Sequence, residues 1–116
     1  MSKYGPDEVE RYLADVNAKY QPALRRVVQI ITEELGVQPV ISYQIIGWRI
    51  NGKMGLFVSG WKDHLSFHGG HALEHLAEVY PQWLKLKGAT LWFQDEPELP
   101  VEIIKEVIAT RVESLN

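Results

Sequence analysis

Hydrophobic residues recur with the period of an α-helix in three segments of the chain: residues 6–16, residues 19–35, and the segment that follows Pro100. The apolar stripes are Val9, Tyr12, Leu13 and Val16 in the first, Leu24, Val27, Val28, Ile31 and Leu35 in the second, and Ile104, Val107, Ile108, Val112 and Leu115 in the third. Gly36 suits a left-handed cap at the end of the second segment. The pattern predicts three amphipathic helices.

The middle of the chain changes to the composition of β-strands. Residues 41–50 and 53–61 are rich in β-branched and aromatic residues, and Asn51-Gly52 between them is typical of a type I′ turn. We therefore expect a hairpin of Ile41–Ile50 with Lys53–Trp61, followed by a third antiparallel strand over His64–His68. Glycines inside these strands favour bulges and bends, which indicates a strongly curved sheet.

After Gly69-Gly70 the spacing of Leu73, Leu76, Ala77 and Tyr80 predicts one short helix that ends at Pro81. Residues 84–87 and 89–93, separated by Gly88, predict one or two further strands, and an acidic loop covers Gln94–Leu99. The expected fold class is α+β. A curved antiparallel β-sheet of about five strands would have the N- and C-terminal helices packed on one face, in a single domain over residues 1–116.

Composition narrows the possible classes of function. The 116 residues carry a net charge of −3 and include no cysteine, which excludes disulfides and thiolate metal sites. The sequence has no basic cluster, so we expect no nucleic-acid partner. No apolar run is long enough for a membrane span, and the N-terminal residues lack the apolar core of a signal peptide. We expect a soluble, intracellular and cytoplasmic protein.

Several short blocks resemble, in order and spacing, the YdhG-like family, also called DUF1801. They are Ile41-Ser42-Tyr43, Asn51-Gly52-Lys53, Lys62-Asp63-His64-Leu65-Ser66-Phe67, Lys87-Gly88-Ala89-Thr90-Leu91-Trp92-Phe93, and Leu99-Pro100 through Ile104 and Arg111. The family commonly has a proline shortly after the Ser-Tyr pair, roughly at Ile46, and this chain has none. The resemblance implies a curved antiparallel sheet covered by helices. It also implies a frataxin-like iron chaperone that binds Fe(II) weakly and delivers it to iron–sulfur or haem assembly proteins.

Two sets of side chains are candidate iron ligands. Carboxylates at Asp7, Glu8, Glu10 and Asp15 lie on the first helix, where they also complement the helix dipole. His71 and His75 are four residues apart and would share one face of a helix, as the competing pair. His64 and His68 are also four apart, but on a strand this separates them by about 13 Å, too far for one metal.

Aromatic residues in the predicted strands offer an alternative function. Together with polar groups at the rim they could line a small-molecule pocket or a protein-interaction surface on the sheet face away from the helices. The candidate ligand-binding residues are Tyr43, Trp48, Lys53, Trp61, His64, Lys87 and Thr90. Trp48 and Trp61 have neighbouring glycines that would leave room beside each ring. No nucleophile elbow, phosphate loop or metalloprotease motif occurs, so we expect a binding protein rather than an enzyme. The sequence does not predict the oligomeric state.

Overall fold

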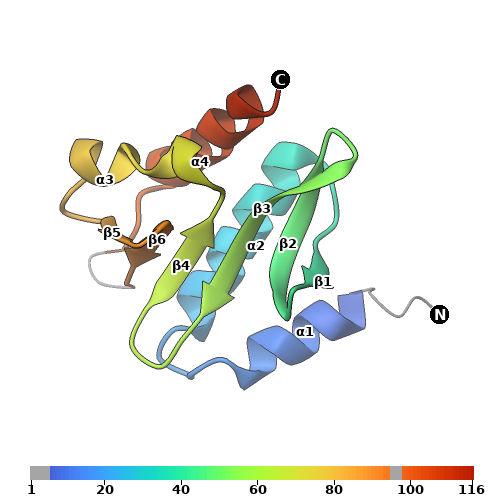
Figure 1. Cartoon of the computed structure of the whole chain (residues 1–116). Coiled ribbons are helices and arrows are strands. Elements are labelled where there is room, and N and C mark those ends of the chain that lie inside the picture. The colour runs from blue at the N-terminus through green and yellow to red at the C-terminus, as the bar shows by residue number, and fades with distance from the viewer. Residues whose placement is uncertain (1–5, 95–97) are drawn as a thin grey trace.

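Six antiparallel strands form one curved sheet within residues 6–94 and 98–116, the part of the chain that the computed structural model describes (Figure 1). The strands are β1 (Val40–Ser42), β2 (Ile45–Ile50), β3 (Lys53–Gly60), β4 (Leu65–His68), β5 (Lys85–Lys87) and β6 (Thr90–Phe93). Their spatial order is β1-β2-β3-β4-β6-β5, so the last hairpin turns back and β6 lies beside β4. The predicted α+β class with an antiparallel sheet is confirmed.

The helices cover one face of this sheet, as the apolar stripes predicted. They are α1 (Pro6–Asp15), α2 (Gln21–Leu35), α3 (Leu76–Val79) and α4 (Val101–Ser114), with a 3-10 helix η1 (His71–Leu73). Figure 1 shows α2 and α4 behind the sheet and α1 across its lower end. Leu24 and Ile31 of α2 and Ile104 of α4 are fully buried. No helix within the described residues is long and apolar enough to cross a membrane.

Backbone conformations with positive φ occur where the sequence predicted them. Gly36 ends α2 with φ of 67°, and its N–H donates to the carbonyl of Thr32. Asn51 and Gly52 have φ of 54° and 81° and join β2 to β3, in which Ile50 pairs with Lys53. The turn and the pairing next to it are therefore confirmed, and the register then shifts at a bulge between Trp48 and Arg49, as glycines in the strands predicted.

Replacing Gly52 by valine should lower the free energy of unfolding by about 1–2 kcal/mol, because β-branched residues resist left-handed backbone conformations. A side chain at Gly52 meets nothing within 4 Å, so the effect is conformational rather than steric. Gly52→Asn is the matched control, since asparagine tolerates this region and should be nearly neutral. Urea unfolding measures both variants, and equal losses would contradict the turn geometry.

The predicted strand Ile41–Ile50 is wrong as one element. Tyr43 and Gln44 have φ of 55° and 66°, and they form a tight turn that folds β1 back on β2. Ser42 pairs with Ile45 and Val40 with Gly47 across this turn. Two non-glycine residues with positive φ are unfavourable, and the pairing of β1 along β2 offsets that strain. The chain thus bends at Tyr43-Gln44 without a proline.

The predicted helix from Leu73 to Tyr80 is also wrong as one element. It is broken into the 3-10 helix η1 and the one-turn α3, with Leu73 and Leu76 both buried. Two buried leucines three residues apart fit a 3-10 turn, in which positions i and i+3 lie on the same side. Of the predicted acidic loop Gln94–Leu99, residues 95–97 lie outside the described part of the chain.

Candidate functional site

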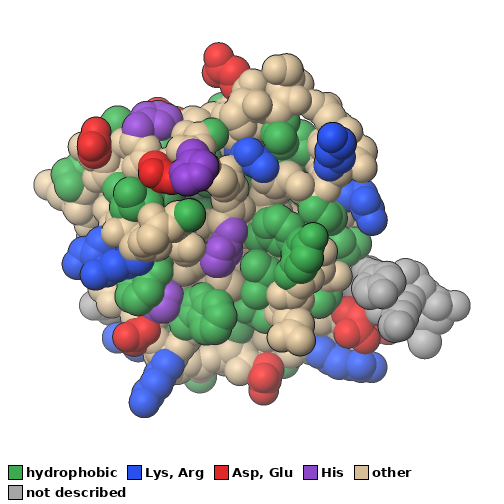
Figure 2. Space-filling model, in the orientation of Figure 1, with side chains coloured by type: hydrophobic (Ala, Val, Ile, Leu, Met, Phe, Trp, Pro, Cys, Tyr) green, Lys and Arg blue, Asp and Glu red, His purple; other side chains and the backbone are tan. Residues whose placement is uncertain are grey.

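The sheet face opposite α2 and α4 is not covered by any helix of the described residues (Figure 1). In β4, Leu65 and Phe67 point into the core, so Ser66 and His68 alternate onto this open face. Figure 2 views the molecule from this side and shows hydrophobic and histidine side chains near its centre with charged side chains around the margin. The predicted grouping of aromatic residues on the face away from the helices is therefore present in part.

The imidazole of His64 is the centre of a stack of rings on this face. The ring of Trp92 lies nearly parallel to it with a centroid distance of 3.4 Å, and the ring of Trp61 is also nearly parallel to it, with a centroid distance of 6.2 Å. Trp92 reaches His64 because β6 pairs with β4, with Ser66 opposite Trp92. Trp61 lies near His64 because the backbone N–H of Trp61 donates to the backbone carbonyl of His64 in the β3–β4 turn. His64 is consequently only 8% exposed.

The orientation of His64 is fixed by Asp63. Nδ1 of His64 lies 2.7 Å from Oδ1 of Asp63. The hydrogen bond from His64, helped by the charges of His64 and Lys62, lowers the pKa of Asp63. Asp63 is therefore a carboxylate at neutral pH. In the neutral imidazole the proton then lies on Nδ1 and Nε2 is left as an acceptor.

A second histidine holds Trp61 in place. Nε1 of Trp61 donates to Oγ of Ser59 at 2.8 Å, and Oγ of Ser59 lies 2.8 Å from Nε2 of His68. Burial, followed by the charge of His64, lowers the pKa of His68 and favours its neutral form. Ser59 then donates its hydroxyl proton to His68 while it accepts from Trp61. This chain of hydrogen bonds orders a tryptophan that is 49% exposed.

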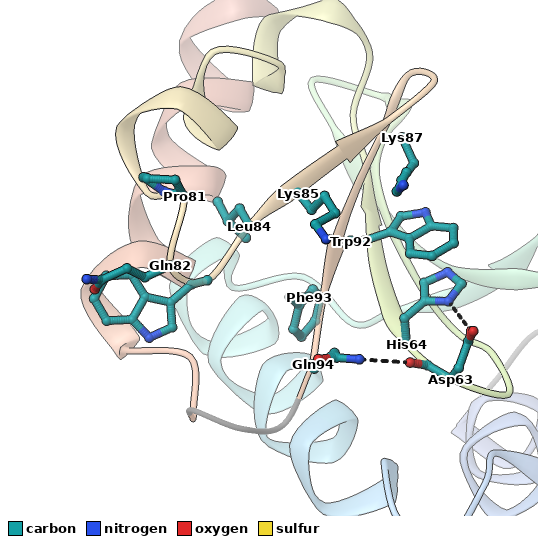
Figure 3. A pocket seen from close by; sticks show the side chains of 11 residues that line it. Asp63, His64, Pro81, Gln82, Leu84, Lys85, Lys87, Trp92, Phe93 and Gln94 are labelled. Atoms are coloured by element: carbon teal, nitrogen blue, oxygen red, sulfur yellow. Dashed lines mark hydrogen bonds and ion pairs between the residues drawn. The ribbon is translucent and has the colours of Figure 1, made fainter.

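A cleft of about 430 Å³ opens beside His64, within the size range of small-ligand sites. Figure 3 shows it between the connection from α3 to β5 on one side and the His64–Trp92 stack on the other. Its walls include Pro81, Trp83, Leu84 and Phe93, and its polar groups include Asp63, Gln82, Lys85, Lys87 and Gln94. The side-chain amide of Gln94 donates to the backbone carbonyl of Asp63 at 3.3 Å, which ties the end of β6 to the β3–β4 turn.

The structure brings together only some of the predicted ligand-binding residues. His64 and Lys87 line the cleft, and Trp61 contacts His64 from the neighbouring depression. Thr90 pairs with Lys87 but does not line the cleft. The other two lie away from the cleft: Tyr43 is 84% exposed in the β1–β2 turn and contacts Phe57, and Lys53 begins β3 at its hairpin.

The inclusion of Trp48 among the ligand-binding residues is wrong. Trp48 is fully buried on the helix side of the sheet, and its Nε1 donates to Oγ1 of Thr32 in α2 at 3.2 Å. The absence of a side chain at Gly47 leaves no room there, because a Cβ at Gly47 would lie 2.5 Å from Met54 and 2.7 Å from the ring of Phe57 on the opposite face of the sheet. The space next to Gly60, beside Trp61, is also occupied, because a Cβ at Gly60 would lie 2.9 Å from the side chain of Val16.

The acidic side chains of α1 are dispersed, and two of them form ion pairs with arginines. Glu10 accepts two hydrogen bonds from Arg25, at 2.8 and 2.9 Å, and this interaction lowers the pKa of Glu10. Glu8 pairs with Arg11 at 3.1 Å. Asp7 and Asp15 are eight positions apart, which on a helix is about 12 Å. Within the described residues no group of three or more potential metal ligands comes together.

His71 and His75 do not lie on one helix, so the premise that placed them on a common face is wrong. His71 begins η1, is 91% exposed at its side chain, and hydrogen-bonds to Glu74. His75 directly precedes α3 and is exposed. Because the chain is not one continuous helix between His71 and His75, their four-residue spacing does not place them on a common helix face.

Three residues that line the cleft were not among the predicted ligand-binding residues: Trp92, Lys85 and Gln94. The alternation of Leu91 and Phe93 with Trp92 would have placed Trp92 on the open face. Lys85 and Lys87 alternate in the same way on β5. The contribution of Gln94 depends on a contact with Asp63 that no local pattern indicates.

Comparison with known proteins supports the fold. The crystal structure of a DUF1801-family protein, YdhG of Bacillus subtilis, is similar to this chain with a TM-score of 0.80. The likeness covers 95% of this chain and 92% of that chain at 13% sequence identity. No family model and no curated protein matches the chain. The structural likeness agrees with the DUF1801 resemblance in the sequence and, at this identity, establishes the architecture.

Proposed function

We propose that this chain is a non-enzymatic binding protein whose ligand is a small molecule held in the cleft beside His64. The observation that carries the proposal is the ordered stack of His64 against Trp92 at the wall of this cleft. Asp63 orients the imidazole, and the β4–β6 pairing fixes the indole before any ligand arrives. Preformed apolar walls with a few oriented polar groups are characteristic of small-molecule sites.

Binding fits His64 better than proton transfer does. Trp92 covers one face of its ring at a centroid distance of 3.4 Å, and only 8% of the residue is exposed. Ser59, the serine hydroxyl with a histidine partner on this face, bonds to His68 and not to His64, and it is fully buried. The imidazole of His64 thus serves as a rigid wall with one hydrogen-bonding edge.

An NMR screen of small aromatic acids, amides and amines tests the proposal. We expect the compounds that bind to shift the indole N–H resonance of Trp92 in a saturable manner. The indole N–H of Trp48 should not move, because it is buried and bonded to Thr32 on the other side of the sheet. Absence of any saturable shift at Trp92, or shifts that follow Trp48 equally, would contradict a small-molecule site in this cleft.

Iron carriage, which the family resemblance implies, is tested by anaerobic calorimetric titration with Fe(II). We expect no saturable heat, because Glu8 and Glu10 would have to leave their arginine partners to bind iron. A variant with Asn or Gln at Asp7, Glu8, Glu10 and Asp15 should behave like the wild type. Saturable heat that disappears in this variant would support an iron carrier, and loss on replacing His71 and His75 would support the histidine pair.

A further inference from the structure

The cleft beside His64 has an asymmetric distribution of charge. Lys85 and Lys87 contribute two cations from β5, and the carboxylate of Asp63 lies beside His64 in the β3–β4 turn. Figure 3 shows the ends of both lysine side chains directed towards Trp92, with His64 and Asp63 on the other side of that ring. A bound molecule would therefore meet positive charge at one end and hydrogen-bond acceptors at the other.

The two lysines occupy these positions because of the sheet register. Lys85 pairs with Trp92 and Lys87 with Thr90, so the side chains at positions 85 and 87 leave β5 on the same face as Trp92. Nζ of Lys87 lies 5.7 Å from the centre of the Trp92 ring. Within the described part of the chain neither ammonium group forms an ion pair with a carboxylate. Both charges are thus directed at the cleft on the Trp92 side, apart from the Asp63 carboxylate at its other end.

The Asp63 end of the cleft favours hydrogen-bond donors and disfavours anionic groups. Asp63 is a carboxylate whose Oδ1 is bonded to His64, which leaves Oδ2 as an acceptor. The amide nitrogen of Gln94 is directed at the Asp63 carbonyl, so the Gln94 side-chain oxygen is a second acceptor. An anionic group would be repelled by Asp63 and attracted by Lys85 and Lys87, which sets the direction of binding.

We propose that the ligand of this cleft is a small organic anion with a flat apolar body, of the aryl carboxylate class. Its carboxylate binds Lys85 and Lys87, its ring lies against the half-buried tryptophans of the cleft, Trp83 and Trp92, and a donor at its far end faces Asp63 and Gln94. This inference rests on the proposed small-molecule function and specifies its ligand class. A cleft of about 430 Å³ accommodates one or two fused rings.

Matched probes separate the charge preference from binding itself. Naphthoate, naphthamide and naphthylmethylamine share one ring system and differ in charge, and calorimetry with the wild type gives their affinities. We expect naphthoate to bind about tenfold more tightly than naphthamide, because two charge-assisted contacts to lysine are added. The amine should bind most weakly, and rising ionic strength should weaken only the carboxylate.

Charge-removing variants locate the preference. Lys85→Gln with Lys87→Gln should reduce the affinity for naphthoate to that for naphthamide and leave naphthamide binding unchanged. Lys53→Gln is the matched control, since Lys53 lies in the β2–β3 hairpin and does not line the cleft. It should change neither affinity. An unchanged Trp48 indole resonance shows that each variant is folded.

The outcomes distinguish the two proposals. If naphthamide binds as tightly as naphthoate while both shift the Trp92 resonance, the anionic class is wrong and the small-molecule site stands. If the double lysine variant keeps the full preference for naphthoate, the assignment to Lys85 and Lys87 is wrong. If none of the three probes binds saturably at Trp92, the anionic class is overturned. Failure of the whole NMR screen at Trp92 overturns the site as well.

Discussion

Replacing Ile108 by alanine is expected to lower the free energy of unfolding by about 2–5 kcal/mol. Ile108 is 3% exposed on α4, within the same core cluster as Leu24 and Ile31 of α2. Truncation removes buried apolar surface and leaves a cavity that the packed helices can fill only in part. Urea unfolding, monitored by circular dichroism, measures the loss.

The control for Ile108 lies on the exposed side of the same helix. Glu113 is exposed on α4, so Glu113→Ala should change the free energy of unfolding by less than about 0.5 kcal/mol. A loss below about 0.5 kcal/mol for Ile108→Ala would show that the α4 stripe does not hold the helix against the sheet. Similar losses in both variants would point to an effect on helix formation rather than on the core.

The elements that sequence predicted well are those specified by local chemistry. The stripes of α2 and α4 repeat at helical spacing over several turns, and their central residues are buried while Leu35, Val112 and Leu115 at the ends are partly buried. Asn51-Gly52 accepts positive φ at both positions, so the turn and the pairing next to it followed directly. In these segments the local preference and the tertiary contacts agree.

The elements that sequence missed depend on distant parts of the chain. Tyr43 and Gln44 have no intrinsic preference for positive φ, and their turn is held by the pairing of β1 with β2. The predicted strand therefore continued through them. The break between η1 and α3 likewise occurs without a helix-breaking residue between Leu73 and Leu76, so no local pattern indicated it.

The candidate site also combines contacts that are local in the sequence with contacts between distant parts of the chain. The pairing of Asp63 with His64 is local, because the two residues are neighbours in the sequence. The stack of His64 on Trp92 requires β6 to lie beside β4, and the order of strands in the sheet is not encoded in the alternation of either strand. The alternation of Ile46, Trp48 and Ile50 with Arg49 would have placed Trp48 on the core side, so this assignment missed a signal that the sequence contains.

Trp92→Ala should weaken the binding of naphthoate by about 30-fold or more, because a preordered aromatic wall contributes about 2–3 kcal/mol to ligand binding when it is well packed. Trp92 is only partly buried, and Leu91 and Phe93 on either side of it still anchor β6 in the core. The variant should therefore stay folded. Calorimetry measures the affinity, and thermal unfolding reports the stability of the same sample.

Trp48→Phe should show the reverse behaviour and is the matched control. It shortens a fully buried side chain and removes the hydrogen bond to Thr32, so the free energy of unfolding should fall by about 1–3 kcal/mol. Its affinity for naphthoate should equal that of the wild type, because Trp48 faces the helices and Trp92 faces the cleft. Unchanged binding in Trp92→Ala, or equal loss of binding in both variants, would show that the open face beside His64 does not hold the ligand.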